Sequence, residues 1–160
     1  MIRLGLGQDS HAFEPEGTSK PLILGGVVFP GQPGLKANSD GDVVLHAIFN
    51  ALSSAIGKRS LGVYADPLCQ QGVTDSRAYL RVALDMVQQA GYTVNNVALT
   101  IEARRPRIEP MAVEMQKSIA RLLGVSDDQV GITATSGEGL TAFGRGEAIQ
   151  VFAIASLVKA

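Results

Sequence analysis

Apolar residues at every second position predict the strands of this chain. Ile2, Leu4 and Leu6 alternate with other residues, so we expect a strand over residues 2–7 that carries the polar run 8–11 at its end. Further strands are expected at residues 22–29, 97–101, 130–134 and 148–158. The last of these is apolar along nearly its whole length, which is typical of a strand buried on both faces.

The segment 22–29 allows two interpretations. Its two apolar runs flank Gly25–Gly26, a pattern typical of a hairpin or of a bulged strand, and Pro30 is expected to end it.

Three segments repeat apolar residues at helical spacing. The first helix is expected from Asp42 to about Ile56, with Ser39, Asp40 or Asp42 as its cap. The second follows the cap Thr74-Asp75-Ser76, carries Leu80, Ala83, Leu84 and Val87 inward and stops at Gly91, whereas the third begins between Pro106 and Pro110 and stops at Gly124. Residues 57–73 hold three glycines, one proline and little periodicity, so we expect a mobile surface loop there.

The resulting order is β, β-hairpin, α, α, β, α, β, β. It predicts an α+β fold in which helices cover one face of a mixed sheet, and the length of 160 residues predicts a single domain over residues 1–160. The other sheet face would then need a cover, for which a second copy of the chain is the simplest candidate. We therefore expect an oligomer.

Composition excludes several classes of protein. Residues of the AVILMFWYC set make up 46% of the chain and mean hydropathy is +0.17, which argues against disorder. A formal net charge of −1 removes the long-range attraction for nucleic acid that a basic domain has. The single cysteine, Cys69, cannot form an intrachain disulfide, and no apolar run reaches the ~20 residues of a membrane helix. We expect a soluble intracellular protein with no nucleic-acid or membrane partner.

The only two histidines each stand near a carboxylate. Asp9 and His11 share one face of an extended segment, and Asp42 and His46 share one face of a helix. If the strand end and the helix start meet, Asp9, His11 and His46 form a two-histidine, one-carboxylate set with an open fourth position, as in catalytic zinc sites. From spacing alone, histidines with a purely structural role are the more common alternative.

Three polar loops could bind anions, and each also has a simpler explanation. Thr133 to Gly139 follows a strand and could hold phosphates, although it matches no Walker pattern. In Gly144-Arg145-Gly146-Glu147 the arginine could contact an anion or pair with Glu147. Arg104-Arg105-Pro106-Arg107 could recognise phosphate or form a solvated surface. Likewise, the residue types in Ser39-Asp40-Gly41-Asp42 are those of turns and helix caps.

Taken in order, the motifs resemble the 2-C-methyl-D-erythritol 2,4-cyclodiphosphate synthase family. The resemblance covers nearly the whole chain and is carried by Gly7-Gln8-Asp9-Ser10-His11-Ala12-Phe13, by Ser39 to Ala47 (SDGDVVLHA) and by Gly144-Arg145-Gly146-Glu147. Asp75-Ser76-Arg77 and the Thr135–Glu138 loop add to it. With the resemblance, the metal interpretation becomes the favoured one.

The resemblance implies a homotrimer whose sheets line the threefold axis and whose active sites lie between subunits. It also implies that Zn2+ binds Asp9, His11 and His46, and that Glu138 helps to hold Mg2+ or Mn2+ among substrate phosphates. The remaining implied site residues are Asn38, Thr135 and Ser136 as catalytic residues, and Ser39, Asp42, Asp66, Ala103, Pro106, Arg107 and Arg145 as substrate contacts.

The implied reaction belongs to non-mevalonate isoprenoid biosynthesis and is intramolecular. In 4-diphosphocytidyl-2-C-methyl-D-erythritol 2-phosphate, the 2-phosphate attacks the β-phosphorus, which releases CMP and closes the cyclic diphosphate. No protein nucleophile is required, so alignment and charge neutralisation should carry the catalysis. The expected location is the cytoplasm of a bacterium, or an organelle if a transit peptide was removed.

Three positions depart from the family pattern. Asn38 replaces the usual histidine, Asn50 replaces an aspartate, and Val63 stands where the family carries the carboxylate for the erythritol hydroxyls, a role that Asp66 could take. These departures motivate a binding scaffold without turnover as one alternative. The other alternative is a phosphohydrolase, in which metal-bound water attacks instead.

Overall fold

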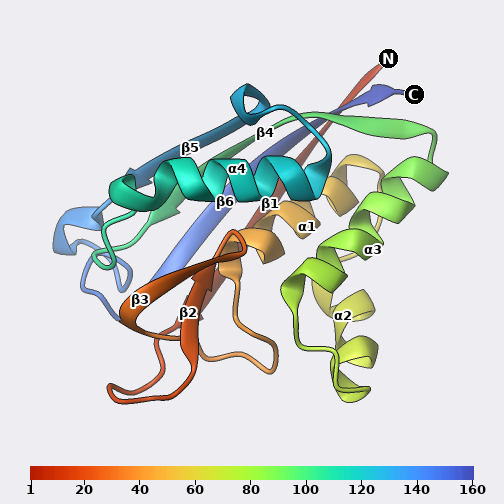
Figure 1. The fold of residues 1–160 in the computed structure, drawn as a ribbon. Helices are drawn as coiled ribbons and strands as arrows, with labels where there is room; N and C mark the ends of the chain where they lie inside the picture. The colour runs from red at the N-terminus through yellow and green to blue at the C-terminus, as the bar shows by residue number, and fades with distance from the viewer.

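Four strands form the main sheet, in the order β1-β6-β4-β5 (Figure 1). The computed structural model describes residues 1–160 and gives the strands as β1 (Ile2–Ala12), β4 (Tyr92–Glu102), β5 (Val130–Thr135) and β6 (Ala148–Lys159). β4 and β5 run parallel, whereas β1 and β4 each run antiparallel to β6. The sheet is therefore mixed, as the order of elements predicted.

The other elements form a separate hairpin, four helices and three short 3-10 turns. They are β2 (Pro21–Leu24), β3 (Val27–Pro33), α1 (Val43–Ala55), α2 (Leu61–Gln70), α3 (Ser76–Gln89), α4 (Ala112–Leu123) and the turns η1 (Glu109–Met111), η2 (Asp127–Gln129) and η3 (Gly137–Gly139). None of the helices combines the length and apolar character needed to cross a membrane.

The helices cover one face of the sheet and leave the other open. Val97 on β4 pairs with Ala155 on β6 and Val130 on β5, and all three side chains are buried on the helix side. On the opposite face, Phe152 and Ile154 of β6 are 41% and 50% exposed. The expectation that β6 is buried on both faces is therefore wrong for the single chain. Its apolar side chains point alternately to the face that the helices cover and to the face that they leave open.

Helix α1 lies directly against β1 because two glycines leave room for it. A Cβ atom on Gly5 would lie 2.0 Å from the carbonyl oxygen of Ala51, and one on Gly7 would lie 2.1 Å from that of Ala47. This approach brings the first turn of α1 to the carboxyl end of β1, where the polar run begins.

Residues 61–70 form α2, so the prediction of a loop over 57–73 is wrong there. Ala65 is buried on the inner side of this helix, and the ring of Tyr64 packs against Phe49 with centroids 5.7 Å apart. Pro67 lies inside the helix. Packing against α1 stabilises a helix that its proline and its glycine disfavour locally.

Several predicted boundaries shift by a few residues. Gly25 and Gly26 form the hairpin turn with φ of 63° and 77°, which selects the hairpin over the bulged strand, but β3 continues past Pro30. The last long helix begins only at Ala112, after the 3-10 turn, and ends at Gly124 with a φ of 71°. Asp42 is the cap of α1, since its side chain accepts from the backbone N–H of Leu45.

Candidate metal centre and its cavity

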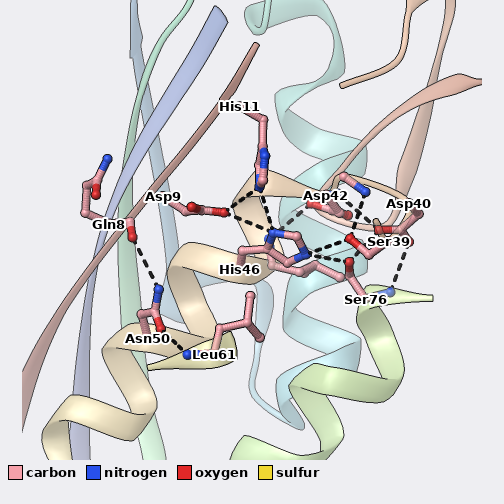
Figure 2. Close-up of polar contacts among 12 residues, drawn as sticks. Gln8, Asp9, His11, Ser39, Asp40, Asp42, His46, Asn50, Leu61 and Ser76 are labelled. Atoms are coloured by element: carbon pink, nitrogen blue, oxygen red, sulfur yellow. Dashed lines mark hydrogen bonds and ion pairs between the residues drawn. The ribbon is translucent and has the colours of Figure 1, made fainter. Parts of the chain in front are cut away.

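The side chains of Asp9, His11 and His46 converge at the carboxyl end of β1 (Figure 2). The Asp9 Oδ2 atom lies 2.9 Å from His11 Nε2 and 3.0 Å from His46 Nδ1, and the two nitrogens are 3.2 Å apart. His46 is buried, whereas the side chains of Asp9 and His11 are 25% and 22% exposed. The histidine on α1 therefore forms the floor of a site that opens toward solvent.

These three donor atoms fit a divalent metal ion. Two ligands of a tetrahedral ion with bonds of about 2.0–2.1 Å lie about 3.3 Å apart, close to the separations seen here. Asp9, His11 and His46 could thus hold a metal ion with one position left for a further ligand.

The charges of the site favour an ionised Asp9. Burial alone would raise the pKa of Asp9, but hydrogen bonds and charge interactions with His11 and His46 outweigh it and place the pKa well below its usual range. For His11, burial lowers the pKa, but the hydrogen bond and charge of Asp9 raise it further, so the net shift is upward. The carboxylate is therefore available as a ligand at neutral pH.

An open cavity of about 480 Å³ adjoins the three side chains. Asn38 and Ser39 line it from the loop before α1, and Asp66 and Cys69 line it from α2. The structure thus brings three of the substrate and catalytic residues expected from the sequence to the same cavity as the triad. The helix that supplies Asp66 is the one that the sequence pattern did not predict.

Asp42 lies behind this cavity, fully buried. Its Oδ1 accepts from the backbone N–H groups of Gly25 at 2.8 Å and Leu45 at 3.1 Å, and its Oδ2 accepts from Gly26 at 2.7 Å. Burial raises the pKa of Asp42 to about 6, although these backbone hydrogen bonds act in the opposite direction. Backbone N–H groups thus occupy both carboxylate oxygens, and Asp42 connects the hairpin turn to the start of α1.

The second ring nitrogen of His46 faces α3. Its Nε2 atom lies 2.8 Å from the hydroxyl of Ser76, which in turn donates to Asp40, and the hydroxyl of Ser39 lies 3.4 Å away (Figure 2). Both residues belong to segments that carry the family resemblance, but the sequence pattern gave Asp40 and Ser76 no role other than as cap residues. Asp75 caps α3 with its own side chain, so the Ser76 hydroxyl is not needed as a cap. A second polar residue next to the cap is the sequence signal that could have indicated a further role for Ser76.

Asn50 joins three elements beside the site (Figure 2). Its side-chain amide donates to the carbonyl oxygen of Gln8 at 3.3 Å and accepts from the backbone N–H of Leu61 at 2.9 Å. An aspartate could accept at only one end of this bridge, so the asparagine suits this chain.

The remaining expected site residues lie in loops at the same end of the sheet, which follow β4 and β5 and precede β6. Two backbone hydrogen bonds join the loops after β4, after β5 and before β6. The N–H of Ala103 donates to the carbonyl oxygen of Thr135, and the N–H of Arg104 donates to that of Phe143. Ser136, Pro106, Arg107 and Glu138 belong to these same loops. Within one chain they are not part of the triad's cavity.

Two features of these loops bear on anion binding. Arg145 forms a 2.9 Å ion pair with Glu147, which is the simpler of the two interpretations of that motif. Glu138 is the only residue other than glycine with a positive φ, at 49°, and it is exposed. Such a backbone conformation is strained and is found more often at functional sites than elsewhere.

Fold and site together define a class: α+β proteins that offer two imidazoles and one carboxylate to a metal ion beside an open cavity. Residues 2–158 match the YgbB family, and the chain belongs to this family.

Curated relatives agree along the whole chain. It is 48% identical over 160 residues to the 2-C-methyl-D-erythritol 2,4-cyclodiphosphate synthase of Chlamydia trachomatis serovar L2b (strain UCH-1/proctitis), covering 99% of this chain and 89% of that protein. It is 47% identical to the synthase of the same name from Chlamydia felis (strain Fe/C-56), covering 99% and 90%.

Solved structures are similar in fold as well. A structure of 2C-methyl-D-erythritol-2,4-cyclodiphosphate synthase has a TM-score of 0.87 at 32% identity, covering 98% of this chain and 100% of that one. The CDP complex of IspF from Plasmodium falciparum has a TM-score of 0.85 at 27% identity, covering 99% and 96%.

Proposed function

We propose that this chain is a 2-C-methyl-D-erythritol 2,4-cyclodiphosphate synthase, a lyase of isoprenoid biosynthesis. The substrate is 4-diphosphocytidyl-2-C-methyl-D-erythritol 2-phosphate, and the products are the cyclic diphosphate and CMP. The observation that carries the proposal is the convergence of Asp9, His11 and His46 beside an open cavity, in a chain that belongs to the YgbB family. A nucleotide ligand is also supported by the related protein solved in complex with CDP.

Two divalent cations complete this proposal. Two imidazoles and a carboxylate with an open fourth position favour Zn2+ at Asp9, His11 and His46. A single carboxylate together with phosphate oxygens favours Mg2+ or Mn2+ at Glu138, whose strained backbone is consistent with a binding role. When bound, the cations neutralise the phosphates and polarise their oxygens.

The chain's own residues align the substrate. The Asn38 amide and the Ser39 hydroxyl face the cavity and donate hydrogen bonds to a phosphate, while Asp66 accepts from the erythritol hydroxyls in place of the carboxylate lost at Val63. Thr135 or Ser136 contacts the diphosphate. Well-aligned intramolecular attack is worth ~7–11 kcal/mol, so a site without a protein nucleophile suffices.

The cytidine end of the substrate belongs to the other group of loops. We assign Ala103, Pro106 and Arg107 to the nucleotide and Arg145 to an anionic group of the substrate. Arg145 can make that contact after it exchanges its exposed ion pair with Glu147 for one with phosphate.

The separation of these two groups supports an oligomer, for which we propose the homotrimer that the family resemblance implies. The triad lies at the β1 edge and Thr135 at the β5 edge, three strand spacings or about 14 Å apart. The pairing also places Thr135 and Asp9 on opposite faces of the sheet. A neighbouring subunit must therefore bring its loops to the triad, and each trimer contains three composite sites.

The open sheet face supplies the surface for that assembly. Its exposed apolar side chains belong to β1 and β6 and are Ile2, Leu4, Leu6, Phe152 and Ile154. We propose that these faces surround the threefold axis of a cytoplasmic enzyme with one domain per chain.

Removing one histidine tests the metal centre. His46→Ala or His11→Ala is expected to lose the zinc ion, because each removes one of three ligands, while the trimer survives since its contacts lie on the sheet face. Metal content by mass spectrometry and molar mass by light scattering measure the two outcomes. Full zinc content in either variant would contradict the ligand assignment.

The reaction itself is tested with purified protein, the cytidine-linked substrate, Zn2+ and Mg2+. We expect equal amounts of CMP and cyclic diphosphate. A product heavier by one water would show hydrolysis instead, and binding without any product would show a scaffold; either result rejects the proposed activity.

A further inference from the structure

His46 faces two different sets of partners through its two ring nitrogens. Nδ1 lies 3.0 Å from Asp9 Oδ2, on the side of the metal centre, and Nε2 lies 2.8 Å from the Ser76 hydroxyl. A neutral imidazole that offers a lone pair to a metal at one nitrogen carries its proton on the other. The orientation of His46 therefore depends on an acceptor at Nε2.

Ser76 is that acceptor because its own proton is directed elsewhere. Its hydroxyl makes a very short contact with the Oδ1 atom of Asp40, and a carboxylate can only accept. The direction is thus set along the series: Nε2–H of His46 donates to Ser76, and Ser76 donates to Asp40. Ser76 is almost fully buried, so water does not compete for its hydroxyl.

Asp40 is held in place by backbone groups. Its carboxylate accepts from the N–H of Ser76 at 3.0 Å and from the N–H of Asp42 at 3.1 Å, and its own N–H donates to the carbonyl of Thr74 at 2.9 Å. These bonds tie the loop before α1 to the first turn of α3. The acceptor at the end of the series is therefore fixed by the fold.

Ser39 is the other hydroxyl near this nitrogen, and it is the weaker partner. It lies 3.4 Å from Nε2 and already accepts from the N–H of Gly41 at 3.2 Å. The contact of Nε2 with the Ser76 hydroxyl, at 2.8 Å against 3.4 Å for Ser39, is the stronger of the two.

We propose that Ser76 and Asp40 are positioning residues of the metal centre, which hold His46 with Nδ1 toward the metal and fix its proton on Nε2. The inference rests on the metal centre of the proposed function, but not on the reaction. It also connects α3, which supplies no ligand, to the strength of metal binding.

The first test is zinc affinity, measured on the full chain by competition with a chromophoric chelator. Ser76→Ala is expected to weaken zinc binding 10–100-fold, the usual effect of losing a hydrogen-bond partner of a ligating histidine. Ser53→Ala is the matched control, because Ser53 is an equally buried serine on α1 that donates to Arg59 at 2.5 Å and does not contact His46. Zinc affinity of Ser76→Ala equal to that of Ser53→Ala would overturn the proposal.

A second variant acts at the far end of the series. Asp40→Asn is expected to weaken zinc binding, and in the double variant Ser76→Ala/Asp40→Asn the losses should not add, because both residues act through one hydrogen bond to His46. Additive losses would show two independent structural effects and reject the series. Asp40→Asn also serves if Ser76→Ala does not fold.

The tautomer of His46 gives a readout that general destabilisation does not move. In zinc-loaded protein, the imidazole 15N chemical shifts should show Nδ1 bound to the metal and the proton on Nε2, and Ser76→Ala should admit a second form with the metal on Nε2 and the proton on Nδ1. A coordinating nitrogen that Ser76→Ala leaves unchanged would contradict the proposal. None of these measurements needs substrate. If zinc binding changes as expected but the protein forms no cyclic diphosphate, the proposed function is rejected and the role of Ser76 and Asp40 stands.

Discussion

Asp42 belongs to the segment that the sequence marks most strongly as a site, yet its contacts are those of a fold-stabilising residue. Its carboxylate joins the Gly25–Gly26 turn to the first turn of α1, one turn before His46. This junction fixes where α1 begins and, with it, where the ligand on α1 points. In this chain the motif serves both the architecture and the site.

The pH dependence of stability tests this role of Asp42. Its pKa is raised from 3.8 to about 6 in the folded chain, so the folded state holds the proton more tightly than the unfolded state. The stabilisation is therefore complete below about pH 4 and is lost as the pH rises through about 6, a change of about 3 kcal/mol at 1.36 kcal/mol per pKa unit.

Asp42→Asn removes this titration. From pH 4 to pH 7, the free energy of unfolding of the unsubstituted chain should fall by about 3 kcal/mol relative to that of the variant. Urea unfolding of both metal-free proteins across this range measures the difference. A constant difference between the two proteins would rule out Asp42 as the titrating group.

At this scale, local spacing predicts more than it first suggests. The i, i+2 spacing placed Asp9 with His11 on one face, whereas Asp42, four positions before His46, turns to the hairpin and not to the cavity. Spacing could not show that Ser76, thirty positions along the chain from His46, completes the surroundings of that ring. Such contacts depend on how helices pack, which no local pattern encodes.

Among the elements, the contact between α1 and β1 has the greatest effect on the site. Gly5 and Gly7 let the helix backbone approach the strand so closely that Asp9 and His46, from different elements, come within 3.0 Å of one another. The two glycines can be read from the sequence. That they contact the backbone of Ala47 and Ala51 is known only from the packing of α1 on β1.

Gly7→Ala should therefore damage both stability and metal binding. Its Cβ would lie 2.1 Å from the Ala47 carbonyl oxygen, so α1 must move away from β1. We expect a loss of about 3 kcal/mol in the free energy of unfolding, the upper end for overpacking, together with weaker zinc binding.

The matched control for that substitution is Gly131→Ala. Gly131 is also a strand glycine, but a Cβ there would meet its nearest atoms only at 4.0 Å. The free energy of unfolding should change by less than about 1 kcal/mol. Equal effects of the two substitutions would mean that close packing of α1 is not what Gly7 provides.

The elements also show where sequence patterns mislead. Helices α1 and α3 have caps and regular apolar spacing, and both lie where they were predicted. Helix α2 lacks a side-chain cap and contains Pro67, and it forms because it packs against α1. Local patterns therefore predicted three of the four helices and missed α2, which brings Asp66 and Cys69 to the cavity.

For the whole molecule, the sequence predicted the mixed sheet and its uncovered face from the order of elements alone. It could not predict that the expected site residues divide between the cavity beside β1 and the loops of β4, β5 and β6, since strand order is set by pairing between distant segments. This division is the reason for proposing composite sites.

Mixing two inactive variants tests the composite site. His46→Ala lacks a ligand of the triad, and Glu138→Ala lacks the carboxylate of the loop group. In trimers refolded together from equal amounts, about one quarter of the interfaces should combine an intact triad with an intact loop, and activity should return to that extent. If each chain held a complete site, the mixture would remain as inactive as its components.

The two ends of the chain leave the sheet together (Figure 1), with Ile2 paired to Val158, whereas Asp9 and His11 pair at its other end with Val151 and Ile149. A short linker between Ala160 and Met1 would therefore span little distance, and new ends could be opened in a remote surface turn. The sheet would keep every strand neighbour in such a circular permutant, so the architecture depends on which strands adjoin rather than on where translation starts.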